Sequence, residues 1–504
     1  MLALIVSTTA FAQSDNTTVS KYLQSQPNPV FRAGHTLPPL TRYGWSLGYD
    51  VRVAMAKNWG YALEYGGYAT ESDVQKDLAD PNSMASKLCA LTASDPKRYK
   101  LAVICSRELP TKNLPPEAWA RDKDGKYLNG KAQSLDGTSW GEDTLVWSPE
   151  APDSIWLEAG RLRADPLRKI RAKCPIAIVL NGGEYGLGVP GFAKTAWEAD
   201  PRIMKAKGDR SWFEYTSIRK AHSEILIANA VRAAVPDRQL YIYYSLSGNI
   251  YSGMKDFDWG SAYENLKTAS DLPSDELYYR HFNDGFVGNK DMLSLVLSAK
   301  GVEISNGNPL TYAWLCGGWP RENLNGDKGL SDITSYTGFL KCFYTAGMVG
   351  GNAGYYDYPK GGFDAEFPAD QPPHWLRQMM ALSQVHALFS HLEPFLRKGD
   401  LLPGPDKGHL FKEFPAYEFP TGDPTARVIA RKMRSKSQWL ITAWAADGKD
   451  RNVTVSIPQL GHITLNARGC GTVYQAKIVG GKPVIVIKDV DGLHPTKGYK
   501  MSSG

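Results

Sequence analysis

The chain has 504 residues, of which 42% are hydrophobic and 11% aromatic, and its formal net charge is +6. This composition excludes a disordered chain, and the length allows a large domain with its own core and a smaller second domain. The positive charge is small for this length and shows no Lys or Arg blocks, which argues against nucleic acid as a partner.

The first segment, residues 1–12, is a short apolar stretch ending in Ala10-Phe11-Ala12. This pattern is typical of a signal peptide cleaved before Gln13, so we expect a secreted or periplasmic protein; a buried helix or strand is the alternative. The polar segment 13–20 predicts no regular structure. No other apolar stretch reaches the roughly 18 residues of a membrane helix, so we expect no membrane association.

Strand-like segments alternate with helix-like segments through residues 35–398. The eight strand-like segments are 41–48, 60–68, 99–107, 175–184, 239–245, 276–282, 309–316 and 353–358. The helix-like segments are 50–58, 72–93, 153–172, 212–235, 290–299, 332–347 and 373–396. This repeat predicts an α/β fold, a (β/α)8 TIM barrel, because an open doubly wound sheet usually has five or six strands. Long insertions at 109–148 and 187–210 are expected to shape the cleft.

The pattern of the sequence changes after Gly399, where Pro and Gly residues separate short runs of alternating apolar and polar residues. The runs are 425–434, 439–445, 452–457, 471–474 and 483–487. They predict an antiparallel β-domain over residues 399–490, a small β-sandwich. Residues 491–504 are expected to be a disordered tail.

The apolar run that begins at Pro175 ends at two glycines and a carboxylate, Gly182-Gly183-Glu184. A run without polar alternation is typical of a parallel strand that is buried on both faces. Barrel enzymes build their active sites at the carboxyl ends of such strands. A carboxylate at that position is energetically costly unless it is used, so Glu184 is the first candidate for a catalytic residue.

Polar and aromatic residues also follow the other predicted strands. Those that we single out as candidates for the site are Arg107, Asn181, Tyr185, Arg280, His281, Asp284, Trp319, Arg321, Glu322, Tyr356 and Asp357. Facing carboxylates among aromatic rings suit hydrolysis of a glycosidic bond, because one acid protonates the leaving oxygen while rings stack on sugars. The scattered histidines and widely spaced cysteines show no metal-ligand spacing, and we expect neither a metal nor an organic cofactor.

The segments Asn181-Gly-Gly-Glu-Tyr-Gly186 and Trp319-Pro-Arg-Glu322, after the fourth and seventh predicted strands, resemble the clan A retaining glycoside hydrolases. The resemblance covers residues 41–397 and implies that Glu184 is the general acid/base and Glu322 the nucleophile. The clan usually has Asn before the acid/base, where Gly183 stands here, and Asn181 is the alternative contact for the sugar 2-hydroxyl. Asp284 and Asp357 are the alternative nucleophiles.

The expected partner is a poly- or oligosaccharide. Four cationic residues are expected near the predicted cleft: Arg107, Arg280, Arg321 and Lys360. Because such side chains bind sulfate and carboxylate groups, an anionic, sulfated or uronic glycan is one hypothesis. The other is that these cations pair with local carboxylates such as Glu108. An inverting glycosidase and a non-catalytic glycan-binding protein are the alternative functions.

Overall fold

The computed structural model describes residues 17–42, 47–65, 70–105, 109–110, 114–133, 139–181, 193–243, 263–274, 276–278, 292–316, 333–354, 374–408 and 411–489. Residues 63–276 belong to one compact unit, and residues 14–62 and 277–504 form a second. The predicted signal peptide and the predicted C-terminal tail lie outside the described residues, so both stay predictions.

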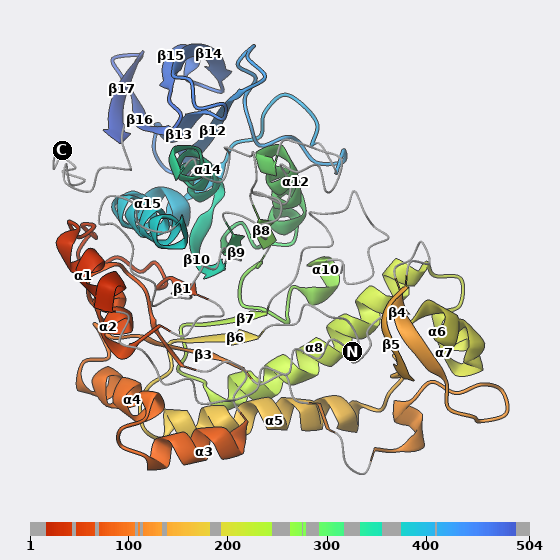
Figure 1. Cartoon of the computed structure of the whole chain (residues 1–504). Coiled ribbons are helices and arrows are strands. Elements are labelled where there is room, and N and C mark those ends of the chain that lie inside the picture. The colour runs from red at the N-terminus through yellow and green to blue at the C-terminus, as the bar shows by residue number, and fades with distance from the viewer. Residues whose placement is uncertain are drawn as a thin grey trace. The chain divides into compact units, whose positions relative to one another are not determined.

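The first unit contains a four-stranded parallel sheet in the order β2-β3-β6-β7, of which Figure 1 labels β3, β6 and β7. Its strands are β2 (Leu63–Tyr65), β3 (Leu101–Ile104), β6 (Ile178–Asn181) and β7 (Leu240–Tyr243). All of their residues are buried, as the continuous apolar runs predict. The strands predicted second to fifth are therefore neighbours in one sheet.

Two long helices of the first unit, α5 (Asp153–Arg171) and α8 (Trp212–Ala234), lie side by side (Figure 1). Their close approach depends on Gly160, because a Cβ at this position would lie 2.8 Å from the Cβ of Ala230. Both helices match the predicted segments to within one residue at each end.

The helical region predicted over residues 72–93 consists of two helices, α3 (Glu71–Ala79) and α4 (Met84–Ser94). Each helix has its own N-cap residue, so the chain starts a second helix instead of continuing the first. Thr70 forms a capping box with Asp73, and the Ser83 side chain accepts a hydrogen bond from the backbone N–H of Ser86.

Both insertions of the first unit contain regular structure that the sequence did not predict. The first insertion carries a 3-10 turn (Pro116–Ala118) and the hairpin β4 (Asn129–Gln133) and β5 (Ser139–Leu145), and the second carries α6 (Lys194–Ala199) and α7 (Pro201–Lys207). The two insertions share a small core that includes Val146, Trp197 and Ile203. A short helix, α10 (Tyr263–Leu266), follows β7.

The second unit contains a four-stranded sheet in the order β1-β10-β9-β8, with β1, β10 and β9 parallel. The strands are β1 (Thr41–Arg42), β8 (Glu276–Tyr278), β9 (Thr311–Cys316) and β10 (Met348–Gly354). The eighth strand was predicted to begin at Ala353, but it begins at Met348. Its glycines allow close packing, because a Cβ on Gly351 would lie 2.8 Å from Leu315 Cδ1.

The helices of the second unit are α1 (Thr17–Ser25), α2 (Tyr49–Asn58), α12 (Met292–Ser305), α14 (Ile333–Ala346) and α15 (His374–Lys398). The prediction of no structure around residues 13–20 is wrong from Thr17 onward, where α1 begins and buries Val19 and Leu23. Among the described residues, none of the helices combines the length and apolar character of a membrane span.

The C-terminal region is an antiparallel β-domain within the second unit. Its larger sheet has the order β11-β12-β13-β16-β17, and β14 pairs with β15. The bounds are β11 (Gly399–Leu401), β12 (Ala426–Met433), β13 (Gln438–Ala445), β14 (Arg451–Ile457), β15 (Gly461–Ala467), β16 (Thr472–Val479) and β17 (Lys482–Asp489). The two sheets contribute to one hydrophobic core, and β11 and β15 were not predicted.

The β-domain packs directly on the last helices through a buried arginine. Arg431 of β12 is 1% exposed, and its guanidinium donates to the carbonyls of Phe395 at 3.2 Å, Leu396 at 3.3 Å and Gly399 at 2.8 Å. It also donates to the carbonyl of Thr345 at the end of α14, at 3.3 Å. Arg431 therefore binds carbonyls at the ends of two helices.

Candidate functional site

Asn181 is the one predicted site residue that the described part of the chain contains. The other predicted residues lie outside it: Glu184, Glu322, Arg107, Tyr185, Arg280, His281, Asp284, Trp319, Arg321, Tyr356 and Asp357. The structure does describe strands that precede them along the chain, including β3, β6, β8, β9 and β10. Glu184 is the third residue after the last residue of β6, and Glu322 is the sixth after the last residue of β9 (184 − 181 and 322 − 316).

Asn181 is the last residue of β6, and its side chain is directed toward α8 and β7. It is 1% exposed, and its Nδ2 donates to the Tyr241 hydroxyl at 2.9 Å and, in a longer contact, to Glu224 Oε2 at 3.4 Å. Side chains alternate along a strand, so Ile178 and Leu180 belong to the opposite face. Its predicted contact with a sugar stays a prediction, but this geometry makes Asn181 a positioning residue for the end of β6.

A buried polar network surrounds the Asn181 amide. Glu224 of α8 is 8% exposed, and burial raises the pKa of its carboxyl, while Arg163 and Lys220 act in the opposite direction. Hydrogen bonds from Tyr243 and Asn181 also favour the carboxylate form. Burial and the neighbouring Glu224 raise the pKa of Tyr243 well above its ordinary value. The network thus joins β6 and β7 to α5 and α8.

This network connects the two strands to the two helices through hydrogen bonds and charge interactions. Arg163 is 7% exposed and donates from Nη1 to the Ala159 carbonyl at 3.0 Å, and Lys220 is 3% exposed. Two cations and one carboxylate in the same buried layer are tolerated because each has partners within the protein. All four polar side chains of the network, those of Asn181, Glu224, Arg163 and Lys220, are buried. Charged residues within the covered stretches of α5 and α8 are the sequence signal that reveals this network.

The cysteine next to this network has the properties of an inert core thiol. Cys105 directly follows β3, is 2% exposed, and burial raises the pKa of its thiol to about 12. A thiol of this kind is not a nucleophile near neutral pH. Within the described residues, no group of three or more His, Cys, Asp or Glu side chains is arranged to hold a metal ion.

Comparison with known proteins finds no matching family model and no matching curated protein. Among solved structures, an α-amylase from Lactobacillus plantarum is 13% identical with a TM-score of 0.44, covering 94% of this chain and 95% of the amylase. A β-L-arabinopyranosidase from Geobacillus stearothermophilus is 8% identical, with a TM-score of 0.44 and coverage of 92% and 99%. The PgaB glycoside hydrolase domain from Bordetella bronchiseptica is 16% identical, with a TM-score of 0.33 and coverage of 57% and 76%. Likeness at these TM-scores and identities carries no argument about this chain.

Proposed function

We propose that the chain is an exported glycoside hydrolase that cleaves O-glycosidic bonds of a poly- or oligosaccharide. Glu184 is the general acid/base and Glu322 the nucleophile of a retaining double displacement. One observation carries the proposal: Glu184 follows, after two glycines, a fully buried strand of a parallel sheet. Loops after parallel strands are where α/β enzymes place catalytic groups.

The arrangement of the strands supports a (β/α)8 barrel as the scaffold. The predicted strands two to five form one sheet in sequence order, and strands one, eight, seven and six form the other. Closing these two orders into a ring gives the strand order of a barrel. Leu40 and Tyr61, just before β1 and β2, also pair in the parallel sense. Barrel enzymes build their active sites from the loops that follow their strands.

The chemistry requires the two carboxyl groups to differ in pKa. Glu184 must hold a proton near neutral pH to give it to the leaving oxygen, which partial burial and a neighbouring carboxylate would favour. Glu322 must stay ionised to attack the anomeric carbon, and Arg321 or Arg280 would help to keep it so. The product then keeps the anomeric configuration of the substrate, because two displacements occur in succession.

Variants that replace the proposed catalytic carboxylates by amides test this proposal. Their activity is measured on a panel of neutral, sulfated and uronic polysaccharides, and the products are analysed. Glu184→Gln and Glu322→Gln should each lower kcat by about 10²-fold or more, while the matched variant Glu158→Gln, at an exposed position of α5, should keep wild-type activity. Asp284→Asn and Asp357→Asn separate the alternative nucleophiles. Full activity in Glu184→Gln would overturn the assignment.

Two further measurements separate the rival functions. NMR of the first-formed product reports the anomeric configuration, and inversion would replace the double displacement with a single one. Binding without any cleavage by the wild type across the panel would favour a glycan-binding protein instead. Activity on sulfated or uronic polymers that is absent on neutral ones would support the anionic substrate, for which Arg107, Arg280, Arg321 and Lys360 are the proposed contacts.

A further inference from the structure

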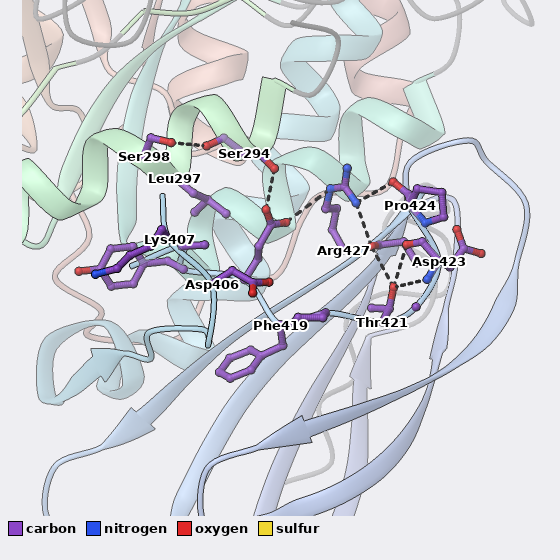
Figure 2. Close-up of a pocket in the computed structure, with 16 residues that line it drawn as sticks. Ser294, Leu297, Ser298, Asp406, Lys407, Phe419, Thr421, Asp423, Pro424 and Arg427 are labelled. Atoms are coloured by element: carbon purple, nitrogen blue, oxygen red, sulfur yellow. Dashed lines mark hydrogen bonds and ion pairs between the residues drawn. The ribbon is translucent and has the colours of Figure 1, made fainter. Parts of the chain in front are cut away.

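A pocket of about 510 Å³ lies in the second unit between α12 and the segment 406–427, and no residue of the proposed active site lines it. Figure 2 shows Ser294 and Leu297 projecting from α12 toward the segment that carries Asp406 and Arg427, while the Ser298 hydroxyl donates to the Ser294 carbonyl within the helix. Its volume falls in the range of sites for small molecules. The pocket therefore has the size of a ligand site and a location that the proposed catalysis does not use.

A partly covered carboxylate, that of Glu418, belongs to the lining of the pocket. Glu418 Oε1 accepts a hydrogen bond from Ser294 Oγ at 2.6 Å, and Oε2 lies 3.5 Å from Arg427 Nε. The Glu418 side chain is 24% exposed, so part of it reaches the pocket. The Arg427 guanidinium is held in place by the carbonyl of Pro424, to which Nη1 donates at 2.8 Å. A carboxylate and a guanidinium thus meet the pocket in a fixed arrangement.

The charges of the lining balance one another. Glu418 is paired with Arg427, and Asp406 precedes Lys407 on the exposed segment. The remaining carboxylate, Asp423, is bound outside the pocket by the Arg451 guanidinium at 2.6 Å. A ligand anion would meet Glu418 and Asp406, and a ligand cation would meet Arg427 and Lys407. Balanced charges of this kind favour an uncharged ligand with both donors and acceptors.

A tyrosine hydroxyl adds an unused hydrogen-bonding group. Tyr417 lines the pocket and is 7% exposed, and no hydrogen bond to its hydroxyl is found among the described residues. This hydroxyl is not among the fully buried, unpartnered side-chain atoms of the described residues, so it is accessible to water or to a ligand, which can supply the hydrogen bond. Leu297, Pro420 and Pro424 add apolar surface to the same lining.

We propose that this pocket is a binding site for a neutral, polyhydroxylated molecule, a mono- or disaccharide. Sugar hydroxyls donate to Glu418 and Asp406 and accept from Arg427 and Lys407. The Tyr417 hydroxyl completes the set as donor or acceptor, and Leu297 and the prolines cover the C–H faces of the ring. The site is independent of the proposed hydrolysis, because it shares no residue with the proposed catalytic groups.

Hydrogen–deuterium exchange of the full chain tests the site, because it reports where a ligand binds. Maltose, cellobiose and sucrose are titrated up to about 100 mM, with glucuronate and glucosamine as charged counterparts. We expect at least one neutral sugar to protect peptides that cover residues 292–300 and 416–427. Protection by the charged sugars alone, or by none of the five, would overturn the proposal.

Three variants complete the test. Tyr417→Phe removes the hydroxyl alone and should weaken the apparent Kd by about five-fold, the effect of one hydrogen bond. Lys407→Gln changes an exposed side chain and should also weaken binding without affecting the fold. Tyr127→Phe, at a 45% exposed tyrosine of the first unit, is the matched control and should bind as wild type. Wild-type affinity in both pocket variants would contradict the site, and Glu184→Gln should leave the protection unchanged even where hydrolysis is lost.

Discussion

A buried histidine should make the second unit sensitive to acid. His386 of α15 is 1% exposed, and its Nδ1 lies 2.8 Å from the Tyr344 hydroxyl. The rings of Phe31 and His35 lie 5.8 and 6.4 Å from its ring. Burial lowers the pKa of His386 to about 3, with His35 acting in the same direction and Glu393 in the opposite one. His386 is therefore neutral in the folded protein from neutral pH down to about pH 3.

The size of the effect follows from the two pKa values. An unfolded histidine titrates near pH 6.5, so below this pH the unfolded state binds a proton that the folded state does not. Stability is unaffected above pH 6.5 and falls as the pH drops toward 3, by about 1.36 kcal/mol per pH unit. Between pH 7.5 and pH 4.5 the loss from His386 alone is about 2.6 kcal/mol.

Urea unfolding between pH 7.5 and 4.5 measures this loss. His386→Gln cannot bind the proton, so its free energy of unfolding should fall by about 2.6 kcal/mol less than that of the wild type over this range. His35, whose pKa burial also lowers, should leave a residual slope. His462→Gln, at an exposed position, is the matched control and should follow the wild type. Parallel pH profiles for wild type and His386→Gln would refute the reasoning.

Three further changes should alter stability or covalent structure. Arg431→Met leaves the carbonyls of Thr345, Phe395 and Leu396 at the helix ends, and that of Gly399 in β11, without this donor and should lower the free energy of unfolding by about 3–5 kcal/mol, measured by urea unfolding. Gly160→Ala forces a Cβ against Ala230 and should cost about 1–3 kcal/mol, most of which Ala230→Gly should restore. Cys89 and Cys174 are buried neighbours, and the interaction with Cys174 lowers the pKa of the Cys89 thiol while that of Cys174 is raised. Once local opening exposes it, the Cys89 thiolate should attack oxidised glutathione, and Cys174 should resolve the mixed disulfide, so that the Cys89–Cys174 disulfide forms and two molecules of reduced glutathione are released, as non-reducing peptide mapping would reveal.

Controls distinguish these effects from general damage. Arg434→Met changes an arginine whose side chain is 56% exposed, and it should cost less than about 1 kcal/mol. A stability loss in Gly160→Ala that Ala230→Gly does not relieve would contradict the steric explanation. Recovery of both thiols as glutathione adducts, rather than as a joined peptide pair, would contradict the proximity of Cys89 and Cys174.

Continuous apolar runs made most of the strands predictable. The run that leads into β6 has no polar residue before Asn181, and the structure buries all four residues of that strand. The start of β10 was missed because Gly350 and Gly351 resemble a turn in sequence. Only the packing of Gly351 against Leu315 explains why glycine suits a strand there.

The environment of Asn181 was not predictable from its position along the chain. Sequence indicates that Asn181 ends a strand, but the face to which its side chain belongs depends on Glu224 and Tyr241, which follow 43 and 60 residues later. The pocket around Glu418 was missed for the same reason, since Ser294 lies 124 residues away in sequence. Contacts between distant segments leave no local pattern in composition or periodicity.

The hydrogen bonds between Arg431 of β12 and the helix ends determine where the chain can be truncated. β11 begins at Gly399, the residue after the end of α15, so no spacer separates helix from sheet. A protein truncated at residue 398 would lose Arg431, and with it the donor for Thr345, Phe395 and Leu396. The described β-domain, from β11 to β17, is thus an integral support for α14 and α15 rather than a separable domain. Trimmed versions of this protein should keep β12 to remain well folded.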